Sequence, residues 1–570
     1  MERDPRHTAV WRKRVTRRDV LKGAGTALGA AWLGSSLVGC GSSTSPQATP
    51  GTGSGGTPVP SGPKRGGIGQ FSVPGQMTHL NAQEGGDQNS TGILMRHVYD
   101  HLFNYDYING RYDLSLAQSV EEAPDHMTYT FKLKPNAKWQ NLPPVNGRNV
   151  TSEDVKVSWD SYAANPRLTG KQIFTDYIDH LETPDPQTFI IKMKQPFAWF
   201  FSTQGFGAPH PTIVMPKEII DQNLMEKVAV GSGGYQVQEF DPAKNLVLRK
   251  RPDGWHNGPD RPYIDKLVFT VISDTAARSA ALKAKQIDQL AARDKLEAEE
   301  FKSYGPDMVI RKERSYTPVI LLRSDDQGFF KDVRVREAIY NCIDVKDLID
   351  RVDLGEGEYT GPVPPFLEHW SLPQDELKKV FPHDLKKAKD LMAAANWDST
   401  KEIEFKYPSD QKTQLLVEVL QQQFAAIGIK TKLVPQDTTT VWTPDTFQKK
   451  NFQLTAVYRL YTGQSPDPYL QHYTTKGRGA GNDARWSDPE VDAIVAKQLV
   501  EFDEAKQRQI IIDAQRLILS KFPPIVKPYA PFVYTANWDY YHDARFEQAY
   551  VGTFGGYSWI DSDSPNYPKR

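Results

Sequence analysis

Two histidines four residues apart are the first side chains whose spacing suggests chemistry. His97 and His101 fall in a stretch whose apolar residues recur with helical spacing, so the sequence predicts a helix from about residue 91 to 102 with both imidazoles on one face. Such a pair could supply half of a zinc site. A third ligand is not evident nearby in the sequence, and helix-borne histidines beside aromatic residues are usually packed in a core. We therefore expect no metal and no cofactor.

Sequence motifs of common enzymes are missing. The chain has no His-Glu-x-x-His, no Gly-x-Ser-x-Gly and no phosphate loop ending in Gly-Lys-Ser/Thr. The run Gly51-x-Gly53-x-x-Gly56 matches the dinucleotide fingerprint, but residues 41–67 are almost wholly Gly, Ser, Thr and Pro, so no strand or helix is expected to flank it. Acidic residues are plentiful, and a glycoside hydrolase with two carboxylates stays open as an alternative. We expect that the protein is not an enzyme.

The loop at residues 459–468 is the place where we expect a ligand. The sequence predicts a strand at 403–407, a helix at 412–427 and a strand at 430–434, which form a βαβ unit with parallel strands and a right-handed crossover. A further strand at 452–458 leads directly into the loop. Ligands of open α/β sheets bind beyond the carboxyl ends of the strands, and this loop lies at such an end.

The first 39 residues have the three parts of an export signal. A basic head with two adjacent arginines at residues 16–19 is followed by an apolar run at 23–38, which is shorter than the ~20 residues that a membrane-spanning helix needs. The head resembles the twin-arginine signal, and the Leu-Val-Gly-Cys sequence ending at Cys40 resembles the lipobox of bacterial lipoproteins. We expect residues 1–39 to be a cleaved signal peptide and Cys40 to carry lipid. The alternative is an ordinary secretory signal with an incidental Cys40.

Composition fits a mildly acidic protein of several domains. The chain has 570 residues, 39% of them hydrophobic, which is enough for two or three domains. Without the predicted signal peptide, 61 basic and 67 acidic residues leave a formal charge of −6, which argues against nucleic acid as a partner. Residues 40–65 have the composition of a flexible linker. A lipidated Cys40 would leave Cys342, the second cysteine, without a disulfide partner.

Short motifs along the predicted mature chain occur in the order found in one protein family. They are His97-Val-Tyr-Asp100, Tyr129-Thr-Phe-Lys-Leu133, Thr151-Ser-Glu-Asp-Val155, Gly231-Ser-Gly-Gly-Tyr235, the run from Asp332 to Ile339 and Gly361-Pro-Val-Pro-Pro365. With these motifs the chain resembles the family 5 bacterial extracellular solute-binding proteins, which include the oligopeptide, dipeptide and nickel receptors of ABC importers. The resemblance covers about residues 66–540.

The resemblance implies an α/β fold like that of the class II periplasmic binding proteins, with two lobes, a hinge and an extra domain. The implied boundaries are 66–108, 230–322 and 525–570 for domain I, 109–229 for domain II and 323–524 for domain III. The hinge would lie near Thr317–Arg323 and Pro524–Pro531. A membrane permease of an ABC importer, an extracytoplasmic location, a monomeric state and closure of the lobes on a solute are implied as well. A chaperone-like or signalling lipoprotein with the same cleft is an alternative.

The resemblance also suggests ligand contacts in the loop. In peptide-binding members a Trp-x-x-Asp precedes the loop proline, and its aspartate pairs with the amino terminus of the peptide. Aligned on Pro468, this sequence has Tyr461 at the tryptophan and Gln464 at the aspartate. Glutamine cannot form a charge-assisted bond with an ammonium group, but its amide suits a hydroxyl or a neutral amide. An oligopeptide-like ligand is the first expectation and an oligosaccharide the alternative, with Asp467 as another carboxylate for the contact.

Two further residues are candidate ligand contacts, each with a structural alternative. Trp442 could stack on a ligand or pack in the core. Arg323 follows the strand predicted at 319–322, and it could reach the ligand or form an ion pair with Asp325.

Overall fold

The described part of the chain begins at residue 62. The computed structural model describes residues 62–84, 94–106, 111–165, 168, 171–202, 206, 212–258, 260–314, 316–460, 465–477, 482–542 and 558–570. The predicted signal peptide, Cys40 and most of the predicted linker lie outside these residues. Lys64–Arg570 form one compact unit, so the folded body begins close to the predicted start at residue 66. Within the described ranges, no helix is long and apolar enough to cross a membrane.

The first two sheets combine strands from residues 235–314 with one strand from the start and one from the end of the folded body. The first has the order β1-β10-β9-β8, made of Ile68–Val73, Lys266–Val271, Asn245–Lys250 and Tyr235–Asp241. The second has the order β11-β19-β12, made of Gln289–Ala292, Tyr529–Trp538 and Met308–Arg314. Helices α6 (Thr275–Lys283) and α7 (Lys295–Lys302) each begin after an aspartate that accepts a hydrogen bond from a backbone N–H three residues further on. The short strands β20 (Tyr541–His542) and β21 (Trp559–Ile560) pair with each other.

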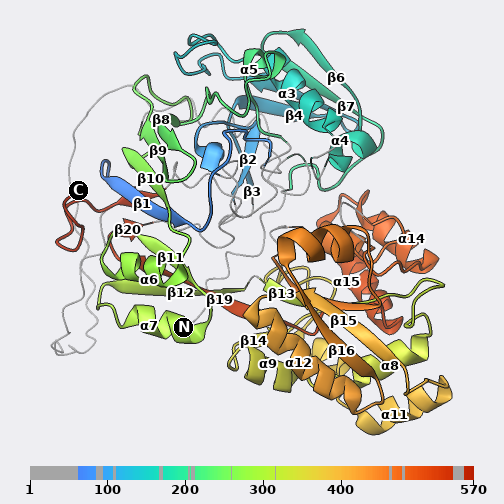
Figure 1. The fold of residues 1–570 in the computed structure, drawn as a ribbon. Helices are drawn as coiled ribbons and strands as arrows, with labels where there is room; N and C mark the ends of the chain where they lie inside the picture. The colour runs from blue at the N-terminus through green and yellow to red at the C-terminus, as the bar shows by residue number, and fades with distance from the viewer. Residues whose placement is uncertain are drawn as a thin grey trace, which may run out of the picture. The chain divides into compact units, whose positions relative to one another are not determined.

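A third sheet, which has four strands, lies between residues 117 and 193. Its order is β4-β5-β7-β6, made of Ala117–Glu122, Thr128–Leu133, Thr188–Met193 and Ile178–Asp185, and every pairing is antiparallel. Helix α3 (Ser152–Ala164) contacts β6 and β7 (Figure 1). It begins at Thr151, whose N–H donates to the Asp154 carboxylate at 2.9 Å, as in a capping box. The smaller elements nearby are β2 (Phe103–Asp106), β3 (Arg111–Leu114), α4 (Gln172–Tyr177) and α5 (Lys217–Asp221).

A five-stranded sheet, which together with the helices around it we call the second lobe, confirms the predicted βαβ unit. Its order is β16-β15-β17-β13-β18, made of Lys430–Gln436, Glu402–Pro408, Leu454–Leu460, Tyr316–Leu322 and Ile525–Val526. β15 is parallel to both β16 and β17. Helix α12 (Gln411–Ala425) connects β15 to β16 and packs against both strands (Figure 1). The strand predicted at 452–458 is β17, so the carboxyl end of a strand does lead into the predicted ligand loop.

Helices and one short strand complete the second lobe. They are α8 (Val333–Cys342), α9 (Val345–Val352), β14 (Gly357–Tyr359), α10 (Gln374–Val380), α11 (Leu385–Ala394), the π-helix η3 (Thr438–Gln448), α13 (Asp467–Gln471), α14 (Pro489–Gln498) and α15 (Glu504–Ser520). Side chains from α8, α9, α11, α12 and the sheet form a single buried apolar cluster.

The chain passes between the sheets at two places. β12 ends at Arg314 in one sheet, and β13 begins at Tyr316 in the other. β18 ends at Val526 in the five-stranded sheet, and β19 begins at Tyr529 in the sheet that contains β12. The second crossing therefore falls within the predicted hinge segment Pro524–Pro531.

The first crossing lies earlier than the resemblance implies. A boundary after residue 322 would assign β13 to domain I, and a boundary after residue 524 would do the same for β18. Instead β13 pairs with β17 and β18, and the change of sheet lies near residue 315. The physical reason is that the side chains of residues 319–322 are fully buried on both faces of the second-lobe sheet.

The helix predicted around the two histidines is wrong for the described residues. Only Met95–His97 form a short 3₁₀ turn, η2, and the chain beyond it is buried without helical structure. His97 stacks on Phe269 with ring centroids 5.9 Å apart, and burial together with the charge of Arg96 lowers the pKa of His97 to about 3. Across the described ranges, no group of three or more His, Cys, Asp or Glu side chains is arranged to hold a metal ion.

The glycine-rich motif at residues 231–234 passes directly beside the backbone of Val98. The Gly233 N–H donates to the Val98 carbonyl oxygen at 2.8 Å. A Cβ added at Gly231 would lie 1.8 Å from the same oxygen, and one at Gly233 would lie 2.7 Å from the His97 carbonyl oxygen. Both positions therefore need glycine, because two backbone segments are in contact there.

We expect the Gly231→Ala substitution to lower the free energy of unfolding by about 2–4 kcal/mol, because the new methyl group would push two backbones apart. Urea denaturation of the purified protein measures this change. Gly305→Ala is the control, since its added Cβ would meet nothing closer than a Trp538 ring carbon at 3.7 Å, and its effect should stay within about 0.5 kcal/mol. Equal stability of the two variants would contradict the prediction.

Candidate ligand site

The carboxyl end of β17 lies at the sheet edge where the chain crosses between sheets. Arg459 and Leu460, the last residues of β17, pair with Thr317 and Tyr316 at the start of β13. β18 is antiparallel to β13 and runs toward the same edge, where the chain continues through Lys527 into β19. The predicted ligand loop thus starts beside both crossings.

Four ionisable side chains lie buried or half-buried around this edge, and we call them the hinge cluster: Arg459, His472, Asp483 and Lys527. The Arg459 guanidinium donates to Asp483 Oδ2 at 2.7 Å, and both side chains are largely buried. Lys527 is 4% exposed, and its Nζ lies 3.5 Å from the Pro362 carbonyl oxygen. The cluster holds two residues with cationic side chains and one carboxylate.

Aromatic rings line the environment of Lys527. Its Nζ is 5.1 Å from the centroid of the Tyr473 ring and 6.0 Å from that of Tyr469. Both tyrosines are fully buried, and the Tyr469 ring makes an edge contact with Phe366. Ring faces stabilise a cation by their quadrupole, although less than a carboxylate would.

The electrostatic environment of the hinge cluster disfavours further positive charge. Burial, followed by repulsion from Arg459, lowers the pKa of Lys527 from 10.5 to about 7, while Asp483 acts in the opposite direction. Burial and the charges of Lys527 and Arg459 hold the pKa of His472 well below its ordinary value. His472 is therefore neutral at physiological pH, and Lys527 is divided between its charged and neutral forms.

A buried carboxylate joins the end of β17 to the second crossing. Asp353 Oδ2 accepts hydrogen bonds from the Tyr529 hydroxyl at 2.6 Å and the Tyr458 hydroxyl at 3.1 Å, and Oδ1 pairs with Lys412 Nζ at 2.6 Å. Burial raises the pKa of both tyrosines well above the ordinary value, so both remain protonated donors. Tyr529 is the first residue of β19, and this network fixes it to the second lobe.

Three of the five predicted ligand residues are described, and Tyr461 and Gln464 lie outside the described residues. Asp467 is the first residue of α13 and is fully buried. Its Oδ1 accepts hydrogen bonds from the side-chain amides of Gln471 at 3.0 Å and Gln498 at 2.9 Å. The Asp467 carboxylate is therefore engaged by amides of its own lobe.

Trp442 packs against neighbouring side chains, and Arg323 forms an ion pair. Trp442 is 6% exposed, donates from Nε1 to the Thr455 hydroxyl at 3.2 Å and stacks on Phe447 with ring centroids 5.3 Å apart. The Arg323 guanidinium donates to both carboxylate oxygens of Asp325, at 2.8 and 3.1 Å. Each side chain has the local partners that a packing or ion-pair role requires.

A tryptophan from the segment after β7 contacts the second lobe. Trp199 Nε1 donates to Gln498 Oε1 at 2.5 Å, and the Ala198 N–H donates to the Leu499 carbonyl oxygen at 2.7 Å. The Trp199 ring also makes an edge contact with Trp370 at 5.3 Å. Because the amide of Gln498 also donates to Asp467, Trp199 is linked through one side chain to the end of the predicted ligand loop.

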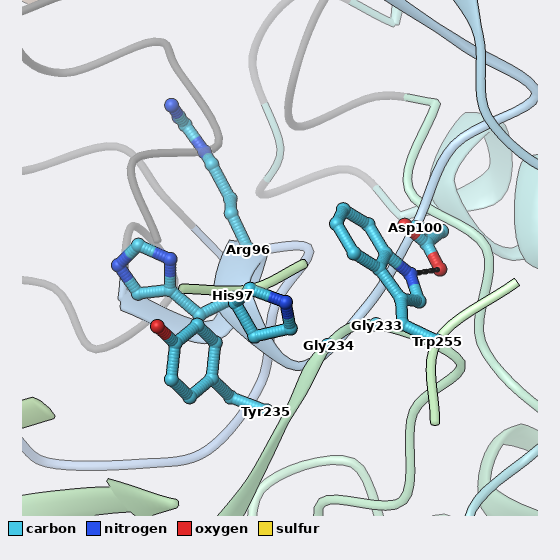
Figure 2. Close-up of a pocket in the computed structure, with 8 residues that line it drawn as sticks. Arg96, His97, Asp100, Gly233, Gly234, Tyr235 and Trp255 are labelled. Atoms are coloured by element: carbon cyan, nitrogen blue, oxygen red, sulfur yellow. Dashed lines mark hydrogen bonds between the residues drawn. The ribbon is translucent and has the colours of Figure 1, made fainter. Parts of the chain in front are cut away.

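A small cavity lies beside the glycine-rich motif at residues 231–234 (Figure 2). It is lined by Arg96, His97, Asp100, Gly233, Gly234, Tyr235, Trp255 and Pro262. Trp255 Nε1 donates to Asp100 Oδ2 at 3.2 Å across its wall (Figure 2). The space holds about one water molecule, so it cannot admit a solute of the expected kind.

The sequence analysis did not identify the hinge cluster or the Trp199 contact. Lys527 stands in the apolar and proline-rich run from Pro523 to Tyr529, and a lone charge in such a run is a signal of a buried charged group. No comparable local signal marks Asp483, Gln498 or Trp199, because their partners are 24 to 299 residues away in the sequence.

Sequence comparison assigns the chain to a protein family. The model of the bacterial extracellular solute-binding proteins, family 5, matches residues 112–481, which is more than half of the chain. Oligopeptide-binding protein AppA of Bacillus subtilis is 25% identical over 344 residues, which cover 56% of this chain and 60% of AppA. Di/tripeptide-binding protein 1 of Pseudomonas aeruginosa is 22% identical over 77% of this chain and 84% of its own length.

Solved structures share the fold. DppA of Helicobacter pylori, in complex with the peptide STSA, has a TM-score of 0.73 and 19% identity, with 88% of this chain and 99% of DppA covered. AppA of Bacillus subtilis, in complex with a nonapeptide, has a TM-score of 0.70 and 19% identity, with 88% of this chain and all of AppA covered. The predicted α/β fold of a periplasmic binding protein is thereby confirmed. The chain belongs to the bacterial extracellular solute-binding proteins of family 5.

Proposed function

We propose that this protein is the lipid-anchored receptor of an ABC importer and that it binds a peptide-like solute beside the hinge. The family match over residues 112–481 is the observation that carries the proposal. Peptide-binding relatives support the choice of solute. The export signal and Cys40 support an extracytoplasmic location at the membrane.

The arrangement of the strands supports binding by closure. Two crossings join the sheets, and short connections of this kind can act as a hinge. A solute that makes contacts available only in the closed form favours that form. A shift from almost wholly open to almost wholly closed requires a preference of about 5.5 kcal/mol.

Extraction of the purified, full mature protein followed by mass spectrometry tests the proposed solute. We expect short peptides to co-purify and to bind again in calorimetry after refolding. Recovery of an oligosaccharide would favour the alternative suggested by Gln464, and hydrolysis of added oligosaccharides would favour a glycoside hydrolase. A protein that carries no solute and binds none of these classes would contradict the proposal.

The Cys40→Ser substitution should release the protein from the membrane fraction, because the thiol that would carry lipid is lost. Incorporation of an alkyne-labelled palmitate in the native host measures lipidation directly. Cys342→Ala is the control, since Cys342 is buried in the folded body, and this variant should keep its label. Label on the Cys40→Ser protein would contradict the predicted anchor.

Tyr461→Ala should weaken solute binding by up to about tenfold without changing the melting temperature, because a ring that stacks on a solute contributes about 0.5–1.5 kcal/mol. Trp442→Ala is the matched comparison. It should lower the free energy of unfolding by about 3–5 kcal/mol, because Trp442 is buried against Phe447, and leave the affinity of the remaining folded protein unchanged. Calorimetry and thermal unfolding separate the two effects, and unaltered affinity in Tyr461→Ala would remove Tyr461 from the site.

Gln498→Met should weaken solute binding about tenfold, because it removes the hydrogen bonds to Trp199 and Asp467 while leaving their polar atoms buried. Small-angle scattering should show less compaction at saturating solute than in the wild-type protein. Gln509→Met is the control, since Gln509 makes one exposed hydrogen bond to Asp513 in the same lobe. Wild-type affinity and compaction in Gln498→Met would show that the Trp199 contact plays no part in closure.

A further inference from the structure

We propose that residues 558–570, which we call the strap, fix the junction at which the predicted linker to the lipid enters the folded body. The strap does so by covering the open edge of β1, the strand that directly follows this junction. The inference goes beyond the proposed receptor function, and it takes from that proposal only the lipid anchor at Cys40.

The place of β1 in its sheet is the first argument. Among the described strands it pairs with β10 alone, in the order β1-β10-β9-β8. The open edge of such a strand presents backbone N–H and C=O groups, and a strand with a single neighbour is the easiest one to detach from its sheet. β1 is also the first described strand after the predicted linker, so a pull on the linker would act on β1.

Side chains of the strap cover the open edge at Ile68. The Ile68 N–H donates to the Tyr567 hydroxyl at 2.9 Å, and the Arg570 guanidinium donates to the Ile68 carbonyl oxygen at 3.2 Å. Gly67 also lies against the strap, since a Cβ added there would lie 3.2 Å from the Ile560 side chain. The strap thus supplies hydrogen bonds that a neighbouring strand would make to this edge.

A buried carboxylate continues the cover at Gln70, and the strap neutralises it. The Gln70 N–H donates to Asp288 Oδ2 at 2.7 Å, and the Asp288 N–H donates to the Gln70 carbonyl oxygen at 2.8 Å. The Arg570 guanidinium donates to both oxygens of the Asp288 carboxylate, at 2.9 and 3.1 Å, and the Arg570 side chain is only 9% exposed. Removing this guanidinium from a fully buried carboxylate is costly, so we expect the strap and the edge of β1 to loosen together.

Ion pairs hold the strap at the junction itself. Lys64 pairs with Asp561 and, at 3.2 Å, with Asp563. The neighbouring Arg65 pairs with Asp260, which lies outside the strap. Surface pairs of this kind add little stability, so they orient the junction, while the buried pair at Asp288 provides the strength.

Proteolysis of the purified, full mature protein with an arginine-specific endoprotease tests the strap. Residues 41–63 contain no Arg, so the bond after Arg65 is the first one in the mature chain that this protease can cut. Arg570→Met should raise the rate of this cleavage at least about tenfold, because the junction opens more often. Lys569→Met is the matched control. It removes an exposed positive charge from the same segment and should leave the rate within about twofold of the wild-type rate.

Hydrogen exchange measured by mass spectrometry shows whether the effect is local. In Arg570→Met the amides of residues 66–73 should exchange at least about tenfold faster than in the wild-type protein, whereas those of β9 should not change. Tyr567→Phe is a milder variant, which keeps the pair between Arg570 and Asp288 and removes only the hydroxyl that binds Ile68. It should accelerate exchange in the same residues about threefold, and it keeps the test open if Arg570→Met fails to fold.

Equal acceleration of exchange in β1 and β9 would show that Arg570 stabilises the sheet as a whole, and it would overturn the inference. Equal rates of cleavage after Arg65 in the wild-type protein, Arg570→Met and Lys569→Met would also overturn it, and the receptor function would stay intact. Faster cleavage in Arg570→Met, in a protein that never reaches the membrane fraction, would contradict the anchor at Cys40 and still support the strap as the element that fixes the start of β1.

Discussion

The Asp353 carboxylate joins three elements, β19, β17 and α12, beside the connections between the sheets. Its oxygens are engaged by Tyr529 at the start of β19, by Tyr458 near the end of β17 and by Lys412 at the start of α12. A buried carboxylate that loses one such partner becomes costly, so the three elements keep a fixed relation to one another. The Asp353 network thus fixes the start of β19 to β17 and α12.

Ion pairs connect the segment after Asp353 to α7 and β12. Glu356, three residues after Asp353, pairs with Lys295 of α7 and Lys312 of β12. The hydrogen bond from Lys312, opposed by partial burial and supported by Lys295, lowers the pKa of Glu356 to about 2, so the pair persists across the physiological range. The residues from Asp353 to Glu356 thus connect both sheet systems, with buried contacts toward one and ion pairs toward the other.

Three charged side chains near the predicted ligand loop differ in their partners. Arg459 and Asp483 neutralise each other at short distance, which is typical of a structural pair. Lys527 Nζ lies near the rings of Tyr469 and Tyr473 and the Pro362 carbonyl oxygen, and burial lowers its pKa to about 7.

The sequence by itself determined the features that depend on neighbouring residues. The βαβ unit around α12 and the strand that leads into the predicted ligand loop follow from local periodicity and turn chemistry, and the family follows from a resemblance of short motifs in order. Tertiary structure decided the rest: the stretch around His97 is not a helix, β13 joins the second lobe, and Asp467 and Trp442 face partners in their own lobe. Those outcomes depend on contacts between distant segments, whose energies override local preference.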